Sequence, residues 1–169
     1  MTPVYVHRYA SPLGAVTLAA NGEALTGLWF DGQRRFPPEV GALPETPLPV
    51  FGTADRWLDI YFGGAAPDFT PALAPAGTPF CRAVWELLLA VPFGQTVTYG
   101  QLAAALAERT GASRVSPRAV GGAVGRNPLS LIIPCPRAVG AGGALTGYAG
   151  GLERKARLLA MERDGTPLI

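Results

Sequence analysis

Residues 127–137 read NPLSLIIPCPR and place one cysteine between two prolines, directly after an apolar run. Each proline disfavours the helical region for the residue before it, so Ile133 and Cys135 are both expected to be extended. Pro134 and Pro136 also lack a backbone N–H. The stretch therefore indicates a rigid corner that fixes the direction of one sulfur, although an inert buried thiol is the simpler alternative for a free cysteine.

The composition predicts a folded chain of one large domain or two small ones. Of 169 residues, 49% are hydrophobic and 15% are charged, which is too apolar for a disordered chain. Neither a membrane-spanning run of about 18 apolar residues nor a signal peptide is apparent. Two cysteines indicate a reducing cytoplasm rather than a disulfide framework. With His7 as the single histidine, a zinc site lacks its usual ligands, and we expect neither a metal nor another cofactor.

Charge is distributed unevenly along the chain. Residues 1–76 carry four arginines against seven acids, a net −3, whereas residues 77–169 carry nine arginines and one lysine against five acids, a net +5. A basic half beside an acidic half favours a polyanion-binding surface on the C-terminal part. Arginine suits bidentate phosphate contacts, but thirteen arginines to one lysine could equally reflect genome composition.

The first thirty residues have the pattern of a small antiparallel sheet. Three strands joined by tight turns are predicted at residues 4–9, 15–20 and 25–30. His7 lies on the first of them and is expected to be structural, because nothing nearby completes a site.

A loop, a helix and a linker are predicted to follow the sheet. Residues 31–50 are polar and proline-rich, and 53–62 have the pattern of an amphipathic helix. Residues 65–79 are rich in Pro, Ala and Gly, as linkers between domains are. We therefore expect an N-terminal α/β domain at 1–76 and a C-terminal helical domain at 77–169.

Helical patterns dominate the second half. Four helices are predicted at residues 79–91, 99–108, 117–124 and 152–163. Cys81 lies on the first and is expected to belong to the core. The second and third are short and are joined by a polar turn in the basic half, which suggests a helix-turn-helix.

The second helix of this pair is almost bare of large side chains. Residues 118–126 read RAVGGAVGR, and each mid-helix glycine costs about 1 kcal/mol against alanine. One reason for such a helix is a backbone that lies very close to another surface, and close helix-to-helix packing is the alternative. The glycines match neither a phosphate-binding loop nor a dinucleotide fingerprint.

Glu162 lies near the end of the last predicted helix. Carboxylates do not favour a helix C-terminus, so this side chain should have a partner. A solvated surface acid is nevertheless the default expectation.

Several separated motifs, in this order, resemble the methylated-DNA–protein-cysteine methyltransferases, also called alkylguanine-DNA alkyltransferases. The resemblance covers nearly the whole chain and rests on residues 11–14 (SPLG), 77–80 (GTPF), 92–94 (PFG), 98–99 (TY), 118–121 (RAVG), 127–128 (NP), 133–135 (IPC) and 147–152 (GYAGGL). It implies a small ribonuclease-H-like α/β domain followed by a helical domain of winged-helix type. It also implies a monomer whose helix-turn-helix enters the minor groove of double-stranded DNA and flips an alkylated guanine into a pocket.

The resemblance assigns the transfer chemistry and the base pocket. Cys135 would accept the alkyl group irreversibly, once per molecule. Tyr99 and Tyr148 would line the base pocket, and the carbonyls of Cys135 and Ala138 would hold the guanine amino group. Ala149 stands where many members have serine, so its backbone N–H remains and the hydroxyl is lost.

The DNA-binding residues are assigned in the same way. Arg118 would fill the gap that the flipped base leaves, and Ala119 and Gly122 on the same helix would face the DNA. Asn127 would fix the turn before the cysteine.

The chain departs from the family at one catalytic position. The family motif reads Pro-Cys-His-Arg, and its histidine relays a proton from the cysteine toward a glutamate at the position of Glu162; here Pro136 replaces it. A thiol at its reference pKa is roughly 7% thiolate at pH 7.4, so reaction is not forbidden. Because general-base help is typically worth about 10²–10⁴-fold, we expect alkyl transfer slowed by that range.

The sequence is compatible with two functions. The first is a DNA repair alkyltransferase, weak or retuned. The second is a non-catalytic protein that binds alkyl lesions and flags them for another pathway, like relatives that lack the cysteine. A cysteine hydrolase or a redox thiol fits poorly, because the sequence offers no histidine base and no Cys-x-x-Cys.

Overall fold

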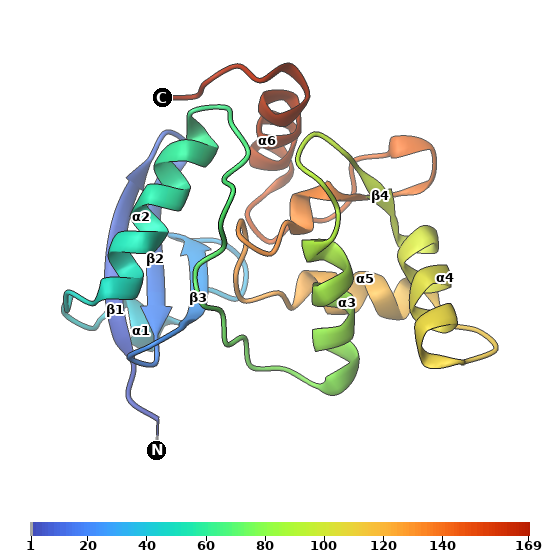
Figure 1. Ribbon diagram of the computed structural model, residues 1–169, viewed down its shortest axis with the longest axis horizontal. Coiled ribbons are helices and arrows are strands. Elements are labelled where there is room, and N and C mark those ends of the chain that lie inside the picture. The colour runs from blue at the N-terminus through green and yellow to red at the C-terminus, as the bar shows by residue number, and fades with distance from the viewer. Residues whose placement is uncertain (1) are drawn as a thin grey trace.

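The computed structural model describes residues 2–169, and its N-terminal part is an antiparallel sheet with a helix across one face (Figure 1). The strands lie in the order β1-β2-β3. The elements of this part are β1 (Tyr5–Ser11), β2 (Gly14–Ala20), β3 (Leu25–Phe30), α1 (Pro38–Gly41) and α2 (Pro49–Phe62).

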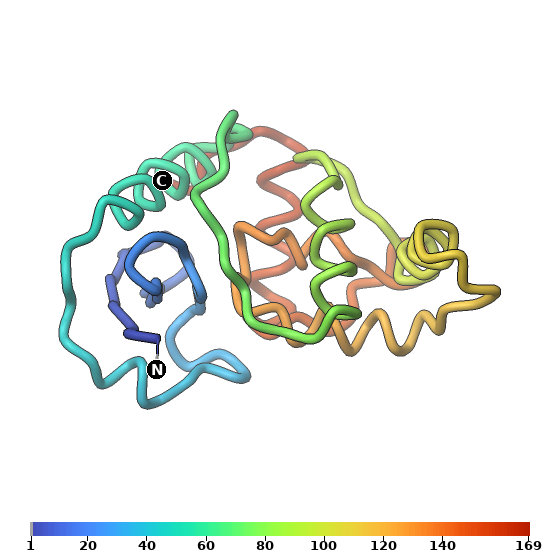
Figure 2. Tube along the Cα trace, turned by 60° about the horizontal axis from the view of Figure 1, so that its bottom comes forward, coloured from blue at the N-terminus to red at the C-terminus, as the bar shows by residue number. Residues whose placement is uncertain are grey.

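The C-terminal part lies beside the sheet and is mainly helical (Figures 1 and 2). Its elements are α3 (Pro79–Leu89), β4 (Val97–Thr98), α4 (Tyr99–Thr110), α5 (Pro117–Gly125), the 3₁₀ turn η1 (Cys135–Arg137), β5 (Ala138–Val139), the 3₁₀ turn η2 (Ala141–Gly143) and α6 (Leu152–Asp164). The two short strands pair in parallel. Within the described residues, every helix is too short or too polar to cross a lipid bilayer.

The predicted fold class is confirmed: an α/β part precedes a helical part. The three strands and the four C-terminal helices lie within one or two residues of their predicted bounds. The loop predicted for residues 31–50 is wrong in two places, because α1 forms within it and α2 begins at Pro49 rather than at Thr53. Both helices start on a proline, whose fixed φ suits the first turn of a helix.

Side-chain caps mark the starts of the helices near the site. The Thr78 hydroxyl accepts a hydrogen bond from Cys81 N, and Thr98 and Gln101 form a reciprocal capping box at α4. Ser116 caps α5 through Ala119 N at 3.3 Å. These local signals explain why a helix as rich in glycine as α5 begins where it does.

The two parts are joined beside the loop that leads to Cys135. The amide of Leu28, in edge strand β3, donates to Pro128 O at 2.8 Å, and Ser130 N donates to Leu28 O at 3.0 Å. The Arg154 guanidinium of α6 lies 4.5 Å from the centre of the Phe30 ring. The sheet edge therefore continues into the cysteine loop and positions it.

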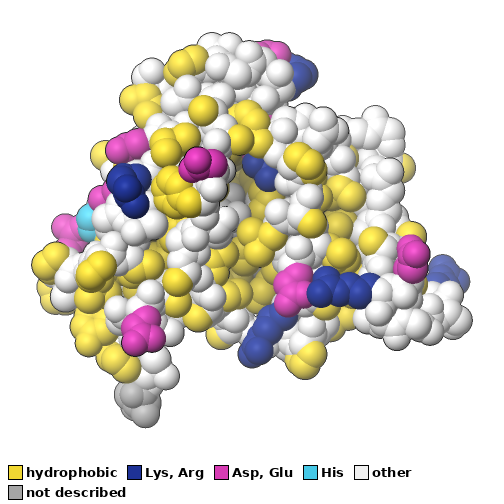
Figure 3. Space-filling model, viewed as in Figure 1, with side chains coloured by type: hydrophobic (Ala, Val, Ile, Leu, Met, Phe, Trp, Pro, Cys, Tyr) yellow, Lys and Arg dark blue, Asp and Glu magenta, His cyan; other side chains and the backbone are white. Residues whose placement is uncertain are grey.

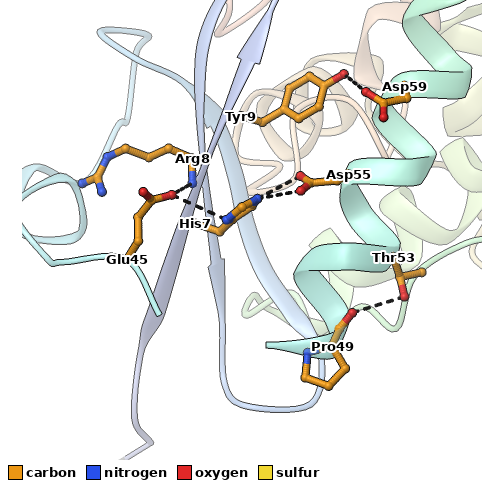
Figure 4. A network of polar contacts seen from close by, with 8 residues as sticks. All are labelled: His7, Arg8, Tyr9, Glu45, Pro49, Thr53, Asp55 and Asp59. Atoms are coloured by element: carbon orange, nitrogen blue, oxygen red, sulfur yellow. Dashed lines mark hydrogen bonds and ion pairs between the residues drawn. The ribbon is translucent and has the colours of Figure 1, made fainter. Parts of the chain in front are cut away.

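His7 links the sheet to the helix that covers it (Figure 4). Its Nε2 lies 2.9 Å from both carboxylate oxygens of Asp55, its Nδ1 lies 3.5 Å from Glu45, and its ring stacks on Phe51 at 5.1 Å. Several acidic side chains gather with the histidine over β1 and α2 (Figure 3). The predicted structural role of His7 agrees with these contacts.

Replacing His7 by alanine should therefore destabilise the sheet–helix contact by about 1–2 kcal/mol, because a hydrogen-bonded and stacked ring is lost. Urea unfolding followed by circular dichroism measures the change. The exposed Arg56→Ala variant on the same helix is the control and should lie within about 0.5 kcal/mol of the wild type. Equal stabilities of the wild type and His7→Ala would contradict the role.

Candidate functional site

A pocket of about 250 Å³ opens beside α5 and has Cys135 in its wall. Its lining comes from both parts of the chain and consists of Arg34, Arg35, Tyr99, Gly121, Gly122, Val124, Gly125, Arg126, Cys135, Gly147, Tyr148 and Ala149. The sulfur is therefore not enclosed in packed hydrocarbon, although the residue is only 5% exposed. A buried thiol that faces a pocket on the arginine-bearing side can meet a reactant there.

Cys135 starts a tight 3₁₀ turn, so the predicted extended conformation of this residue is wrong. Arg137 N donates to Pro134 O at 3.0 Å and closes the turn, while Cys135 N donates to Ile133 O at 2.7 Å. Pro136 takes the second position of this turn, where its missing N–H leaves no backbone donor unpaired. These bonds, made in a buried segment, outweigh the steric preference for an extended residue before Pro136.

Asn127 holds the loop that delivers the cysteine. Its buried amide donates to Leu129 O at 3.2 Å and to Ile133 O at 2.8 Å, and its side-chain oxygen accepts from Leu129 N at 2.9 Å. One side chain thus pairs three backbone groups that would otherwise be unsatisfied in the interior. The turn-fixing role expected for Asn127 agrees with this geometry.

The protein environment favours the neutral form of the thiol. Burial raises the pKa of Cys135 to about 12, and a hydrogen bond from Asn127 and the charge of Lys155 offset only part of that effect. The buried thiol is therefore less ionised than an unperturbed thiol would be, because burial disfavours the charged form, and the sequence alone did not show this burial.

Lys155, the single lysine of the chain, is fully buried behind the cysteine turn. Its ammonium group donates to Ala138 O at 2.5 Å and to Thr146 O at 2.7 Å. Burial lowers its pKa, and the neighbouring Cys135 opposes that shift. No sequence motif assigned a role to Lys155. The one feature that could have drawn attention to it is that it is a single lysine among thirteen arginines.

The sequence-assigned base-pocket residues fall into two groups. Tyr99, Tyr148 and Ala149 line the pocket together with the cysteine. The Tyr148 hydroxyl donates to Ser130 O at 2.7 Å, and the sulfur lies 3.5 Å from the same carbonyl. Ala138 is instead buried outside the lining, and its carbonyl already accepts a hydrogen bond from the lysine.

Glu162 is buried and fully bonded, so the default expectation of a solvated acid is wrong. Its carboxylate accepts from Arg137 Nε at 2.8 Å, from the Tyr61 hydroxyl at 2.6 Å and from Gly94 N at 3.1 Å. The expectation that Glu162 has a partner is confirmed. The network stabilises the turn through Arg137, and no hydrogen bond within the described residues links it to the sulfur.

The bare face of α5 looks into open space rather than into another helix. Val120, Ala123 and Val124 are buried, whereas a side-chain carbon added at Gly121 or Gly125 would meet nothing closer than 3.9 Å outside its own helix. Close helix packing therefore does not explain the exposed Gly122 and Gly125, whereas Gly121 is half-buried beside Tyr99 of α4.

The sequence-assigned DNA-binding positions on this helix lie at the surface. Arg118, Ala119 and Gly122 are all exposed. An exposed helix face without side chains allows a large partner to approach the backbone closely.

Replacing Glu162 by glutamine should lower the free energy of unfolding by about 3 kcal/mol, because it leaves the buried Arg137 charge unpaired. Urea unfolding of Glu162→Gln, Arg137→Met and the double variant measures the coupling. The double variant should lose less than the sum of the single losses. A wild-type stability for Glu162→Gln would show that the network does not stabilise the fold.

Comparison with known proteins accounts for both parts of the chain. The family model of the ribonuclease-like domain of 6-O-methylguanine DNA methyltransferase matches residues 4–75, and that of its DNA-binding domain matches 79–164. A methylated-DNA–protein-cysteine methyltransferase of Mycobacterium leprae is 44% identical over 90% of this chain and 88% of its own. One of Methanosarcina acetivorans is 40% identical over 94% and 98%. A crystal structure of Mycobacterium tuberculosis OGT in complex with DNA covers 96% of this chain and 95% of its own, with a TM-score of 0.80 at 39% identity. The chain belongs to the 6-O-methylguanine DNA methyltransferase family.

Proposed function

We propose that this protein repairs alkylated double-stranded DNA by moving the alkyl group of a flipped 6-O-alkylguanine onto Cys135. The observation that carries the proposal is the sulfur in the wall of a pocket beside the bare, exposed face of α5. In the transfer a sulfur–carbon bond forms, the bond from the alkyl carbon to O6 breaks, and the thiol proton passes to the guanine. The reaction needs no cofactor, and each molecule reacts once.

The proposed DNA contacts follow the exposed side of the helix-turn-helix. Arg118 occupies the place of the flipped base, and Ala119 and Gly122 lie against the minor groove. Tyr99, Tyr148 and Ala149 receive the base. We place the reaction in the cytoplasm and assign it to a monomer with domains at 1–76 and 77–169.

The positioning groups behind the cysteine follow from the contacts described above. Asn127 holds the loop, and Glu162 orients the turn through Arg137. The charge of buried Lys155 favours the thiolate form of Cys135. Pro136 cannot help to form the thiolate, because its side chain has no group that accepts a proton. The carbonyl of Ala138 remains the expected acceptor for the guanine amino group, and it would have to share its lone pairs with the lysine.

Mixing the pure protein with duplex carrying labelled 6-O-methylguanine tests the proposal. Label should move to Cys135, and the rate should rise about tenfold per pH unit between pH 7 and 10, because the pKa of about 12 keeps the thiolate scarce throughout. Peptide mapping identifies the labelled residue. Cys135→Ser is the control and should accept no label.

A matched Pro136→His variant restores the family's residue. It should react faster by up to about 10²–10⁴-fold, the usual worth of a general base. Tight binding of the alkylated duplex without any transfer of label, in the wild type and in this variant, would instead favour the non-catalytic lesion-binding function.

Replacing Arg118 by alanine should weaken duplex binding and base extrusion while the fold stays intact, because the side chain is exposed at the start of α5. Fluorescence anisotropy with a labelled duplex measures the affinity, and 2-aminopurine fluorescence next to the lesion measures extrusion. Circular dichroism is the control for folding. An unchanged affinity would argue that α5 does not face the DNA.

A further inference from the structure

Two arginines of the N-terminal part lie at the pocket that holds the cysteine of the C-terminal part. Arg34 and Arg35 line this pocket together with Cys135 and Arg126. Both arginine side chains are exposed, and among residues 2–169 neither guanidinium makes a hydrogen bond or an ion pair. Neither the motifs nor the family resemblance assigned a role to them.

The segment that carries these arginines is fastened across the domain boundary. Buried Gln33 accepts from Phe30 N at 2.9 Å and donates to the Ser130 hydroxyl at 3.2 Å. Arg34 N donates to Ala149 O at 3.2 Å. The backbone that carries the two arginine side chains is therefore fastened beside the pocket by bonds to loops of the C-terminal part.

Arg35 has a left-handed backbone with φ of 63°, the one positive φ outside glycine in the described residues. This conformation costs an L-residue about 1–2 kcal/mol, and such strain persists where the surroundings impose it, commonly at functional sites. The left-handed conformation of Arg35 turns the chain next to the pocket. A glycine at this position would make the same turn without the strain.

The N-terminal half is otherwise poor in positive charge that could attract a polyanion, since residues 1–76 carry a net charge of −3. Its other two arginines are used elsewhere: Arg8 donates to Gly41 O and Leu43 O, and Arg56 lies over the Phe69 ring. Among the described residues of this domain, the two unpaired arginines are the ones that line the pocket. Arg126 supplies a further cation from α5 on the same lining.

We propose that Arg34 and Arg35 bind the backbone phosphates next to the flipped nucleotide, so that the ribonuclease-like domain forms part of the DNA interface. The inference rests on the proposed function, since the pocket must first receive a nucleotide. Arginine forks match phosphate oxygens bidentately, and phosphate contacts fix register without reading sequence. Arg34 and Arg35 would thus position the DNA and take no part in the chemistry. The DNA-binding surface would then include these two side chains as well as the exposed face of α5.

The salt dependence of duplex binding tests the proposal. Each lost phosphate contact lowers the slope of log K against log salt by about 0.9, so Arg34→Ala/Arg35→Ala should reduce it by about 2 and weaken binding roughly 100-fold at low salt. Arg56→Ala removes one charge from the same domain away from the pocket and should leave the slope unchanged. Arg34→Lys/Arg35→Lys keeps the charges and should recover most of the slope.

A second readout separates DNA contact from damage to the pocket. Free 6-O-benzylguanine carries no phosphate, so the alanine pair should lose far more of its reaction rate with duplex than of its rate of benzyl transfer from the free base to Cys135. If the alanine pair loses both reactions to the same extent, or if its salt slope equals that of the wild type, the inference about Arg34 and Arg35 is wrong while the proposed function stands. If the wild type neither binds the alkylated duplex nor takes label from it, the proposed function fails as well.

Discussion

The buried carboxylate of Glu162 joins three segments that are far apart in the sequence. It accepts hydrogen bonds from Arg137 in the cysteine turn, from Tyr61 on α2 and from Gly94 before β4. These donors belong to both domains. Burial and then the charge of Glu162 raise the pKa of Tyr61 well above its usual value, so the phenol stays a proton donor. A buried charge with this many partners specifies one arrangement of α6, the turn and the sheet domain.

That arrangement has a chemical consequence for the sulfur. In the family pattern the glutamate is one end of a relay through histidine, whereas here its oxygens are occupied by arginine, tyrosine and a backbone amide. Cys135 is left with Asn127 and Lys155 as the groups that favour its ionised form, against a larger effect of burial. The protein therefore combines a well-ordered site with a thiol that burial keeps mainly neutral, and the alkyl transfer that we propose for Cys135 is accordingly expected to be slow.

The exposed face of α5, where we propose the DNA contact, follows a different constraint, which is that a helix without large side chains leaves its backbone open to close approach. Helix α5 buries Val120, Ala123 and Val124 and leaves its glycines on the pocket side. The cost of glycine in a helix is offset by packing on α3 and α4, where the Trp85 indole also bonds Ala123 O at 2.9 Å. The loop at Gln33 extends the same surface into the sheet domain.

Local patterns in the sequence determined the helices and strands and singled out the cysteine that we propose as the nucleophile. Period-two alternation with turn residues predicted the three strands, and proline or hydroxyl caps predicted where α3, α4 and α5 begin, because these signals act within a few residues. The proline-flanked cysteine, the bare helix and the motif order were readable for the same reason. Only the tertiary structure decided what lies behind Cys135: the pairing of Glu162 with Arg137, the burial of Lys155 and the rise in the pKa of the thiol. It also brought Arg34 and Arg35 to the pocket, about a hundred residues before the cysteine in sequence, since contacts between distant segments and the depth of burial leave no local pattern.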